Sequence, residues 1–379
     1  MNFQNFDLEY FQSQWERTVE INLADSSVKC ANVSDLLAGE DPRPLVEMPL
    51  YYPEVNGTVL LRERIAALYP NASAANVLVT VGAAQANWMA CSTLLEAGDE
   101  VIVVSPGYRQ VWGLAKNAGC RVKGTHLRPQ NNWRLDLDEL ESLATPKTKL
   151  ISIVNPNNPT GSILTHEEMR RIVDICEKTG AWLHADEVYR GTELTGDETP
   201  SFWGMYERVI CVNSLSKAYG LAGLRIGWAV ASPQMIEELW RRHEYAVIAA
   251  SGPSMKLAEI ALQPAKRKTL LDRQRRLSRE GHAVLEQWVR DQDGRFFVNK
   301  AVATSIAFVG YTFGMPSAEL ADHIRTKASV LVAPGGYLGT ENHLRITVGY
   351  EPKKVRTALE RIGAVAEELA RTNVAAARS

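Results

Sequence analysis

Short runs of apolar and β-branched residues alternate with amphipathic stretches through the first two thirds of the chain. The runs that we expect to form strands lie at residues 77–80, 100–105, 150–154, 182–185, 209–213 and 226–230. The stretches that we expect to form helices lie at residues 62–69, 83–96, 108–118 and 166–179. Strands that alternate with helices are typical of parallel βαβ units, in which helices cover both faces of the sheet. The pattern therefore predicts an α/β fold with a mostly parallel central sheet flanked by helices.

The pattern changes after about residue 235, where long helices precede expected strands near 305–309, 330–332 and 344–347 and a closing helix from Pro352. This α+β pattern predicts a second, smaller domain. A chain of 379 residues also exceeds the roughly 300 residues at which a single core stops growing. The resulting division is an N-terminal arm at 1–45 that joins the small domain or covers the site, a large α/β domain at 46–255 and a small C-terminal α+β domain at 256–379.

Charge and composition exclude several classes of protein. The 42 Lys and Arg residues nearly balance 44 Asp and Glu residues, so the net charge is −2. Such a chain has no strong field to hold a polyanion, and we expect no nucleic-acid partner. The five cysteines form no CxxC pair, which is typical of reduced thiols. Because the chain has neither an apolar run of ~20 residues nor a signal-peptide pattern, we expect a cytoplasmic protein without a membrane partner.

A lysine follows one of the expected strands. The segment SLSK at 214–217 comes directly after the strand at 209–213, and ligands of open α/β sheets bind beyond the carboxyl ends of strands. Ser214 and Ser216 can bind an anion together with free backbone N–H groups, and Arg225 can hold two phosphate oxygens at once. On these residues alone, a phosphate-bearing ligand and a solvent-exposed lysine in a glycine-rich turn remain equally open.

Polar and aromatic residues follow the other expected strands. Asp186, at the end of a central strand, is costly to bury unless a cation meets it. A protonated pyridine nitrogen is such a cation, and Tyr189 can point its phenol at the same ring. The remaining signals are GAAQ at 82–85 (a phosphate-binding helix start), SPGY at 105–108 (an aromatic for stacking) and NPNNPTG at 155–161. We also expect cis peptide bonds at Ser105-Pro106 and Asn158-Pro159.

The order of these motifs, with HLRI at 343–346, resembles the class I/II aminotransferases, enzymes of PLP fold type I. The match covers roughly residues 45–350. It implies pyridoxal 5′-phosphate as the cofactor, a homodimer with shared active sites, and Lys217, Asp186 and Tyr189 as catalytic residues. Lys217 would form the Schiff base, Asp186 would meet the pyridinium nitrogen, and Tyr52 would reach the phosphate of the partner's cofactor. The other implied cofactor contacts are Gly82, Ala83, Ala84, Tyr108, Asn158, Ser214, Ser216 and Arg225.

The resemblance leaves the reaction open. Arg345 and Asn158 would bind the substrate, and the freed Lys217 amine would act as the base at Cα, forming a quinonoid. Transamination in amino acid metabolism is the first expectation. The alternative is a cyclase, γ-replacement or elimination enzyme of secondary metabolism on a hydroxyarginine-like or S-adenosylmethionine-like amino acid. The N-terminal arm is similar to that of capreomycidine synthases and related enzymes that act on arginine derivatives. This similarity implies that Glu9 and Asp25 would pair with a guanidinium of the substrate. The alternative is that Glu9 lies on an exposed helix face and Asp25 in an ordinary turn.

Two other functional classes fit the sequence less well. A dehydrogenase would need G-x-G-x-x-G after its first strand, and the expected strand at 77–80 is followed by no such motif. A PLP-binding regulator would need a DNA-binding segment in addition to this fold. The seven histidines lack metal-ligand spacing, so we expect no metal site.

Overall fold

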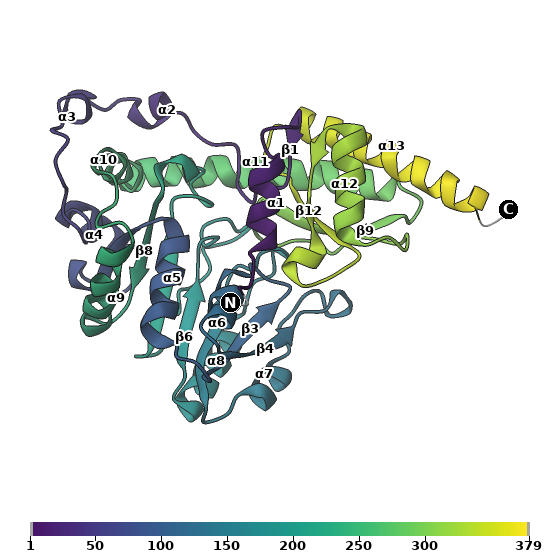
Figure 1. Cartoon of the computed structure of the whole chain (residues 1–379). Helices are drawn as coiled ribbons and strands as arrows, with labels where there is room; N and C mark the ends of the chain where they lie inside the picture. The colour runs from purple at the N-terminus through teal and green to yellow at the C-terminus, as the bar shows by residue number, and fades with distance from the viewer. Residues whose placement is uncertain (1–2, 377–379) are drawn as a thin grey trace.

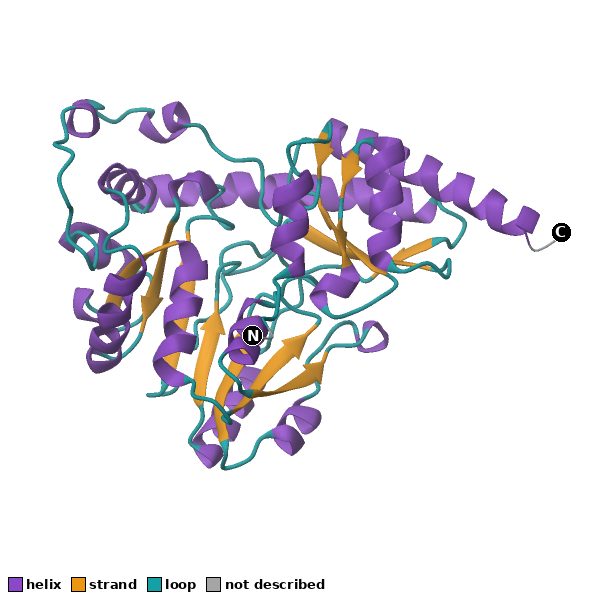
Figure 2. Cartoon of the chain, in the orientation of Figure 1, coloured by secondary structure: helices purple, strands orange, loops and turns teal. Residues whose placement is uncertain are grey.

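A seven-stranded sheet, a four-stranded sheet and a separate two-stranded pair organise the described part of the chain (Figure 1, Figure 2). The computed structural model describes residues 3–376. The larger sheet has seven strands, in the order β2 (Val77–Val81), β8 (Ile226–Val230), β7 (Val209–Ser214), β6 (Trp182–Asp186), β5 (Thr148–Val154), β3 (Glu100–Ser105) and β4 (Arg121–His126). The predicted α/β architecture with a mostly parallel central sheet is confirmed. The expected cis bonds at Ser105-Pro106 and Asn158-Pro159 are also present, and Asn155-Pro156 is cis as well.

Two features of this sheet differ from the sequence-based expectation. Strand β8 runs antiparallel to both of its neighbours, β2 and β7, instead of continuing the parallel pattern. A parallel pair needs a crossover of about a dozen residues or more, usually a helix, and only η3 (Ala222–Leu224) lies between β7 and β8. Strand β4, with the sequence RVKGTH, was not predicted because it is an edge strand with few apolar residues.

Helices cover both faces of the larger sheet. Leu150 and Ile151 are neighbours on β5, and they belong to two different apolar clusters because successive strand residues point to opposite faces. Leu150 packs with α5 (Gly82–Leu94), α6 (Gln110–Asn117) and α9 (Pro233–Ala246), whereas Ile151 packs with α8 (His166–Thr179). Helix α8 begins with a capping box between Thr165 and Glu168 and ends at Gly180, whose φ is +72°.

The smaller sheet is antiparallel and has the order β12 (Ala333–Pro334), β13 (His343–Thr347), β10 (Ile306–Tyr311) and β9 (Phe296–Val298). The helices α12 (Ser317–Ala328) and α13 (Pro352–Ala376) pack beside it. In Figure 1 the long helix α11 (Pro264–Arg290) runs across the molecule from α10 to α13. The remaining helical segments are α2 (Val33–Leu37), α3 (Arg43–Val46), α4 (Val59–Ala66), η1 (Ala74–Asn76), η2 (Pro129–Asn131), α7 (Leu137–Leu143), α10 (Gly252–Ala261) and η4 (Gly335–Leu338).

The N-terminal arm contacts the C-terminal part of the chain. Helix α1 (Asp7–Trp15) packs against β12 and η4, and β1 (Ile21–Asn22) pairs in parallel with β11 (Val330–Leu331). Residues 24–27 then lie between the two sheets, where they contact Tyr189 in the segment after β6 and Ser305 directly before β10. The domain boundaries at residues 45 and 255 stay a prediction. No helix within residues 3–376 combines the length and apolar character needed to cross a membrane.

Candidate active site

The amine of Lys217 lies between the two sheets. The residue follows β7, and its Nζ donates a hydrogen bond to Ser26 Oγ of the N-terminal arm at 2.8 Å. Burial lowers the pKa of Lys217, and the nearby positive charge of Arg345 lowers it further. A lysine with a lowered pKa is more often the neutral amine, which is the form that attacks a carbonyl group.

Asp186 is a buried acid at the carboxyl end of the central strand β6. Its side chain accepts a hydrogen bond from the Val188 N–H at 3.1 Å, and the residue is only 5% exposed. Burial raises the pKa of Asp186 from 3.8 to about 6, although hydrogen bonds from Val188 and from the Asn87 side chain act in the opposite direction. A buried carboxylate becomes favourable when a cation meets it. The site therefore suits a ligand with a protonated ring nitrogen.

Two tyrosines border the same space. Tyr108, which follows β3, donates a hydrogen bond from its hydroxyl to Glu9 Oε1 at 3.0 Å, and its ring meets Phe6 edge to face at 5.1 Å. Tyr189 is buried, and its hydroxyl donates to the Ser26 carbonyl at 3.0 Å. Since Lys217 also contacts Ser26, the Tyr189 phenol and the Lys217 amine are neighbours. Burial raises the pKa of both phenols, so both remain hydrogen-bond donors at neutral pH.

The start of helix α5 and Arg225 form a compact cationic cradle. A Cβ atom added at Gly82 would lie 2.3 Å from Arg225 Nη2, so with any larger residue the guanidinium would have to move away from the helix start. Arg225 Nη1 lies 3.4 Å from Ser216 Oγ, and the Ser216 N–H donates to Ser214 Oγ at 3.2 Å. The N–H groups of the first helical turn, at Gly82, Ala83 and Ala84, have no partner within the helix. A helix N-terminus beside a guanidinium and two hydroxyls is suited to binding a phosphate group.

Arg345 joins the smaller sheet to the larger one. It lies on β13 and is only 1% exposed. Its Nη1 donates to Asn158 Oδ1 at 3.2 Å and its Nη2 donates to the Ala24 carbonyl at 2.7 Å, whereas its Nε has no partner among residues 3–376. These partners are neutral oxygens. A buried guanidinium without a carboxylate partner is suited to binding the carboxylate of a ligand.

The two acids of the N-terminal arm also approach this space. Glu9 accepts from Tyr108, and Asp25 Oδ2 accepts from the Tyr350 hydroxyl at 2.6 Å. The other oxygen, Asp25 Oδ1, is buried and has no partner among the described residues. Both carboxylates act electrostatically to raise the pKa of Lys217. The structure therefore brings Glu9 and Asp25 to the edge of the site that contains Lys217.

Tyr52 is the one predicted site residue that the structure leaves outside this assembly. Its side chain is 80% exposed, and it borders a cavity of about 780 Å³ whose lining residues come from segments 48–58 and 247–259. It contributes nothing to the site of its own chain. The contribution to a partner's site stays a prediction.

Sequence reasoning missed two residues of this region. Ser26 contacts both Lys217 and Tyr189, and the Asn87 side chain acts to lower the pKa of Asp186. The signal for Ser26 was weak, since it lies in a short irregular segment of the arm. Asn87 had a clearer signal, because it is a polar residue on a helix whose neighbouring positions Ala86 and Ala90 are apolar and buried.

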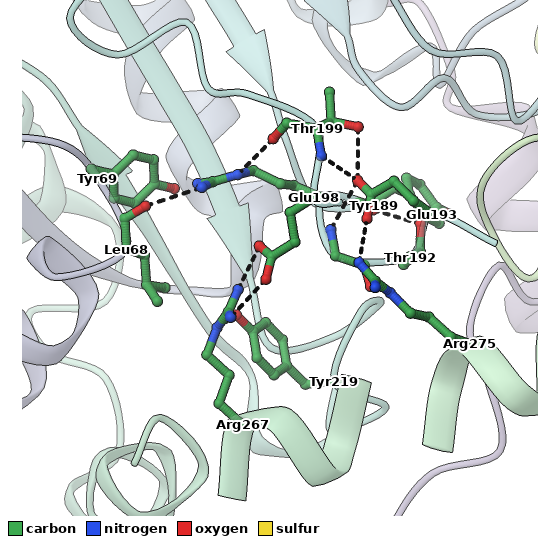
Figure 3. A network of polar contacts seen from close by, with 12 residues as sticks. Leu68, Tyr69, Tyr189, Thr192, Glu193, Glu198, Thr199, Tyr219, Arg267 and Arg275 are labelled. Atoms are coloured by element: carbon green, nitrogen blue, oxygen red, sulfur yellow. Dashed lines mark hydrogen bonds and ion pairs between the residues drawn. The ribbon is translucent and has the colours of Figure 1, made fainter. Parts of the chain in front are cut away.

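The loop after Tyr189 is fixed to helix α11 by a buried polar network (Figure 3). Thr192 Oγ1 donates to the Tyr189 carbonyl at 2.5 Å. Glu193 accepts from Gly191 N–H at 3.2 Å through one carboxylate oxygen and pairs with Arg275 at 3.0 Å through the other. The loop therefore holds Tyr189 in place through contacts made far from the site.

The chain is similar to known proteins in sequence and in fold. The family model for aminotransferases of class I and II matches residues 49–362. Capreomycidine synthase from Streptomyces vinaceus is 29% identical over 316 residues, covering 83% of this chain and 79% of that protein. Aspartate aminotransferase from Pyrococcus horikoshii is 29% identical over 337 residues, covering 84% of each. A PLP-dependent aminotransferase from Streptococcus suis has a crystal structure with a TM-score of 0.91 and 29% identity, covering 97% of this chain and 99% of that one. The chain therefore belongs to the PLP-dependent aminotransferases of class I and II.

Proposed function

We propose that the protein is a PLP-dependent aminotransferase whose amino donor is an α-amino acid with a cationic side chain. The observation that carries the reaction type is the proximity of the charged groups of Lys217, Asp186 and Arg345, of which Asp186 and Arg345 are buried. The family and the relatives named as aminotransferases favour this reaction over cyclisation, replacement or elimination. The observation that carries the substrate class is the pair of carboxylates at Glu9 and Asp25.

The residues of the site fit pyridoxal 5′-phosphate part by part. The cradle of Gly82 and Arg225 suits the phosphate, and the buried carboxyl of Asp186 suits the ring nitrogen. The Lys217 amine suits the aldehyde. When it is bound, the cofactor supplies a carbon that amines attack and a ring that accepts the electron pair released at Cα.

Different side chains of the protein would bind the substrate, orient it and accept its proton. Arg345 binds the α-carboxylate and so orients the Cα–H bond toward Lys217. The Lys217 amine accepts the proton from Cα and returns it later in the cycle, and its lowered pKa favours the neutral form that this step needs. The Ser26 hydroxyl accepts a hydrogen bond from Nζ and so holds the amine in position.

The substrate class follows from charge. Asp25 Oδ1 is buried without a partner among residues 3–376, and a buried carboxylate oxygen is costly unless a cation or donor meets it. Glu9 is an exposed residue of α1 that contacts the Tyr108 hydroxyl, so it lies at the solvent side of the site. An amine or guanidinium on the substrate side chain would meet both carboxylates.

A panel of amino donors tests both parts of the proposal. The purified protein with its cofactor is mixed with pyruvate or 2-oxoglutarate and with arginine, lysine, norleucine or alanine, and the 2-oxo acid products are measured by mass spectrometry. We expect transfer from arginine or lysine to exceed transfer from norleucine, which has a similar length and no charge, by roughly 10-fold or more. Transfer from none of the donors would refute the reaction, whereas a preference for norleucine would refute only the substrate class.

Variants of the two acids make the substrate test specific. Asp25→Asn and Glu9→Gln should reduce the preference for the cationic donors roughly 10-fold and leave transfer from norleucine nearly unchanged. Glu16→Gln is the matched control, because Glu16 carries the same charge at the other end of α1. An unchanged preference in both acid variants would contradict the assignment of these carboxylates.

We also propose that two copies of the chain form the active unit. Several large apolar side chains on segment 46–52 and near residue 245 face solvent; their exposed fractions are 78% for Val46, 87% for Leu50, 74% for Tyr51, 80% for Tyr52 and 92% for Tyr245. Exposed apolar patches on this scale mark interfaces, and the closed assembly of two copies would be symmetric. Tyr52 would then enter the site of the partner.

Hybrid dimers test this arrangement. Lys217→Ala and Tyr52→Ala subunits are each expected to give weakly active or inactive dimers. A mixture that exchanges subunits would regain activity, because one of the two sites then has both Lys217 and the partner's Tyr52 intact. If Tyr52 acted within its own chain, no hybrid would contain an intact site, and mixing would restore nothing.

A further inference from the structure

A cavity lies at the carboxyl ends of β5, β3 and β4, apart from the residues assigned to the cofactor and the substrate. Its volume is about 290 Å³, and its walls come from these three strands, from α6 and from the end of η4. Lys217, Arg225 and Arg345 do not line it, whereas Tyr108 does, so the cavity adjoins the candidate active site. Open α/β sheets bind ligands beyond the carboxyl ends of their strands, and a cavity of this size holds a small molecule.

Arg109 contributes a guanidinium to the wall of this cavity. Its Cζ lies 3.7 Å from the centre of the Trp112 ring, and this stacking limits the movement of a long side chain. The Arg109 side chain has no hydrogen bond or ion pair with any residue in the range 3–376. Asp7 of α1 attracts it electrostatically without forming an ion pair. Guanidinium N–H groups that are partly withdrawn from water and have no acceptor favour the binding of an anion.

The hydroxyl of Ser105 lies at the same corner of the cavity. A Cβ atom added at Gly339 would lie 2.5 Å from Ser105 Oγ and 3.8 Å from Arg109 Nη1, so both polar groups approach this glycine. Ser105 Oγ has no hydrogen-bond partner within the described part of the chain. The Gly107 N–H donates to the Leu338 carbonyl at 3.0 Å, which fixes the end of η4 beside the end of β3. The absence of a side chain at position 339 therefore leaves space next to a guanidinium and a hydroxyl.

The other charged groups near the cavity do not neutralise Arg109. His126 also lines the cavity, and its Nδ1 lies 3.0 Å from Glu139 Oε1. Arg128 lies 3.5 Å from the same oxygen, so the Glu139 carboxylate already has two partners. None of the described residues that line the cavity is acidic. The cavity therefore offers one unmatched positive charge.

We propose that this cavity, which we call the Arg109 pocket, is a second binding site that takes a small oxyanion, a carboxylate or a phosphate, between Arg109 and Ser105. An arginine can donate two parallel hydrogen bonds to either anion, and the serine hydroxyl can donate a third. The site is separate from the cradle at Arg225 and from Arg345, so the inference does not rest on the proposed function. Because the walls include the ends of β3 and η4, the anion would connect the large sheet to the C-terminal part of the chain.

The experiment observes Arg109 directly in the protein with its cofactor, so that the cradle at Arg225 is filled. Arginine side chains are labelled with ¹⁵N, and the Nε–H signal of Arg109 is assigned from its loss in Arg109→Met. The signal is followed during titration with sodium phosphate and, separately, with sodium succinate at constant ionic strength. We expect it to shift and saturate with a Kd of about 1 mM or below for at least one of the two anions. The anion that saturates the signal identifies the chemical class of the ligand.

Matched controls make this measurement specific. Arg121 lies at the amino end of β4, and its signal, assigned from Arg121→Met, should not saturate. Ser105→Ala should weaken the binding roughly 10-fold, the usual effect of losing one hydrogen bond to a charged group. Gly339→Ala should abolish it, because the new Cβ would meet Ser105 Oγ and fill the corner. Gly98→Ala is the control for backbone strain, since Gly98 has a φ of +95° against +99° at Gly339 and no atom within 4 Å of an added Cβ.

Each outcome supports or overturns the Arg109 pocket. An Arg109 signal that changes without saturating, or that changes no more than the Arg121 signal with both anions, would overturn it. Unchanged affinity in folded Ser105→Ala would also overturn it, and this variant decides the matter if Gly339→Ala does not fold. Because the signal belongs to Arg109 alone, binding at Arg225 or Arg345 cannot be mistaken for it, and the result stands even where no amino transfer is found.

Discussion

Because Arg225 lies so close to Gly82, the substitution Gly82→Ala, which adds one methyl group, tests whether these two residues bind the phosphate of the cofactor. In Gly82→Ala, the new Cβ would lie 2.3 Å from Arg225 Nη2 and 3.0 Å from its Cζ. Nonbonded atoms prefer about 3.5–4.0 Å, so the guanidinium has to move by roughly 1 Å or more. Its contact with Ser216 Oγ is already 3.4 Å long and would be lost. Arg225 would then no longer meet a phosphate held at the start of α5.

The expected cost has two separable parts. Gly82 has a φ of +71°, so alanine there loses about 1–2 kcal/mol of stability through backbone strain alone. Losing one hydrogen bond to a charged group costs a further ~1.5–3 kcal/mol in cofactor binding, which weakens the affinity roughly 10- to 150-fold. Titration of the cofactor-free protein with pyridoxal 5′-phosphate measures the affinity, and urea denaturation measures the stability.

Gly204→Ala is the matched control. Gly204 has a φ of +83° and no atom within 4 Å of an added Cβ, so this variant carries the backbone strain without the clash. Both variants should lose stability, and only Gly82→Ala should lose cofactor affinity. Equal cofactor affinity in the two proteins would refute the cradle of Gly82 and Arg225.

Three further predictions follow from single side chains. Lys217→Ala should abolish amino transfer in a coupled assay while the protein stays folded, and more than a trace of turnover would exclude Lys217 as the base. Without cofactor, the raised pKa of Asp186 means that stability is lost as pH rises from about 4 to about 6. Each unit of pKa shift corresponds to ~1.4 kcal/mol of stability. Asp186→Asn should therefore be more stable than the wild type by roughly 3 kcal/mol at pH 7 and equally stable below pH 4. Urea denaturation at each pH measures this difference. Glu193→Gln removes the carboxylate partner of the partly buried Arg275, which keeps its hydrogen bonds to the Gly191 and Gly196 carbonyls, and should cost roughly 1.5–3 kcal/mol of stability. Glu237→Gln, in an exposed pair, should cost less than ~0.5 kcal/mol, and similar losses in the two variants would contradict the structural role of the network.

The architecture of the larger sheet followed from the sequence because its signals are local. Apolar runs of strand length with helical stretches between them predict parallel strands. A glycine, acid or lysine directly after such a run must then lie at the carboxyl edge of the sheet, because the strand ends there. Lys217 and Asp186 were found in this way, each at the carboxyl end of a strand. The antiparallel direction of β8 was missed because the pattern of its residues is the same in either direction, and only the short link before it excludes a parallel crossover.

The partners of these residues came from the tertiary structure alone. The hydrogen bond from Lys217 to Ser26 joins positions 191 residues apart, and that from Arg345 to Ala24 joins positions 321 residues apart. No local pattern specifies such pairs, because they depend on how the arm and the smaller sheet pack over the strand ends. The orientation of the Asn87 amide is a similar case, because it depends on hydrogen bonds with His184 and Gln110, which lie on two other elements. The sequence by itself determined which chemical groups stand at the sheet edge, and tertiary packing decided their distances, burial and charge, because those depend on every neighbouring element at once.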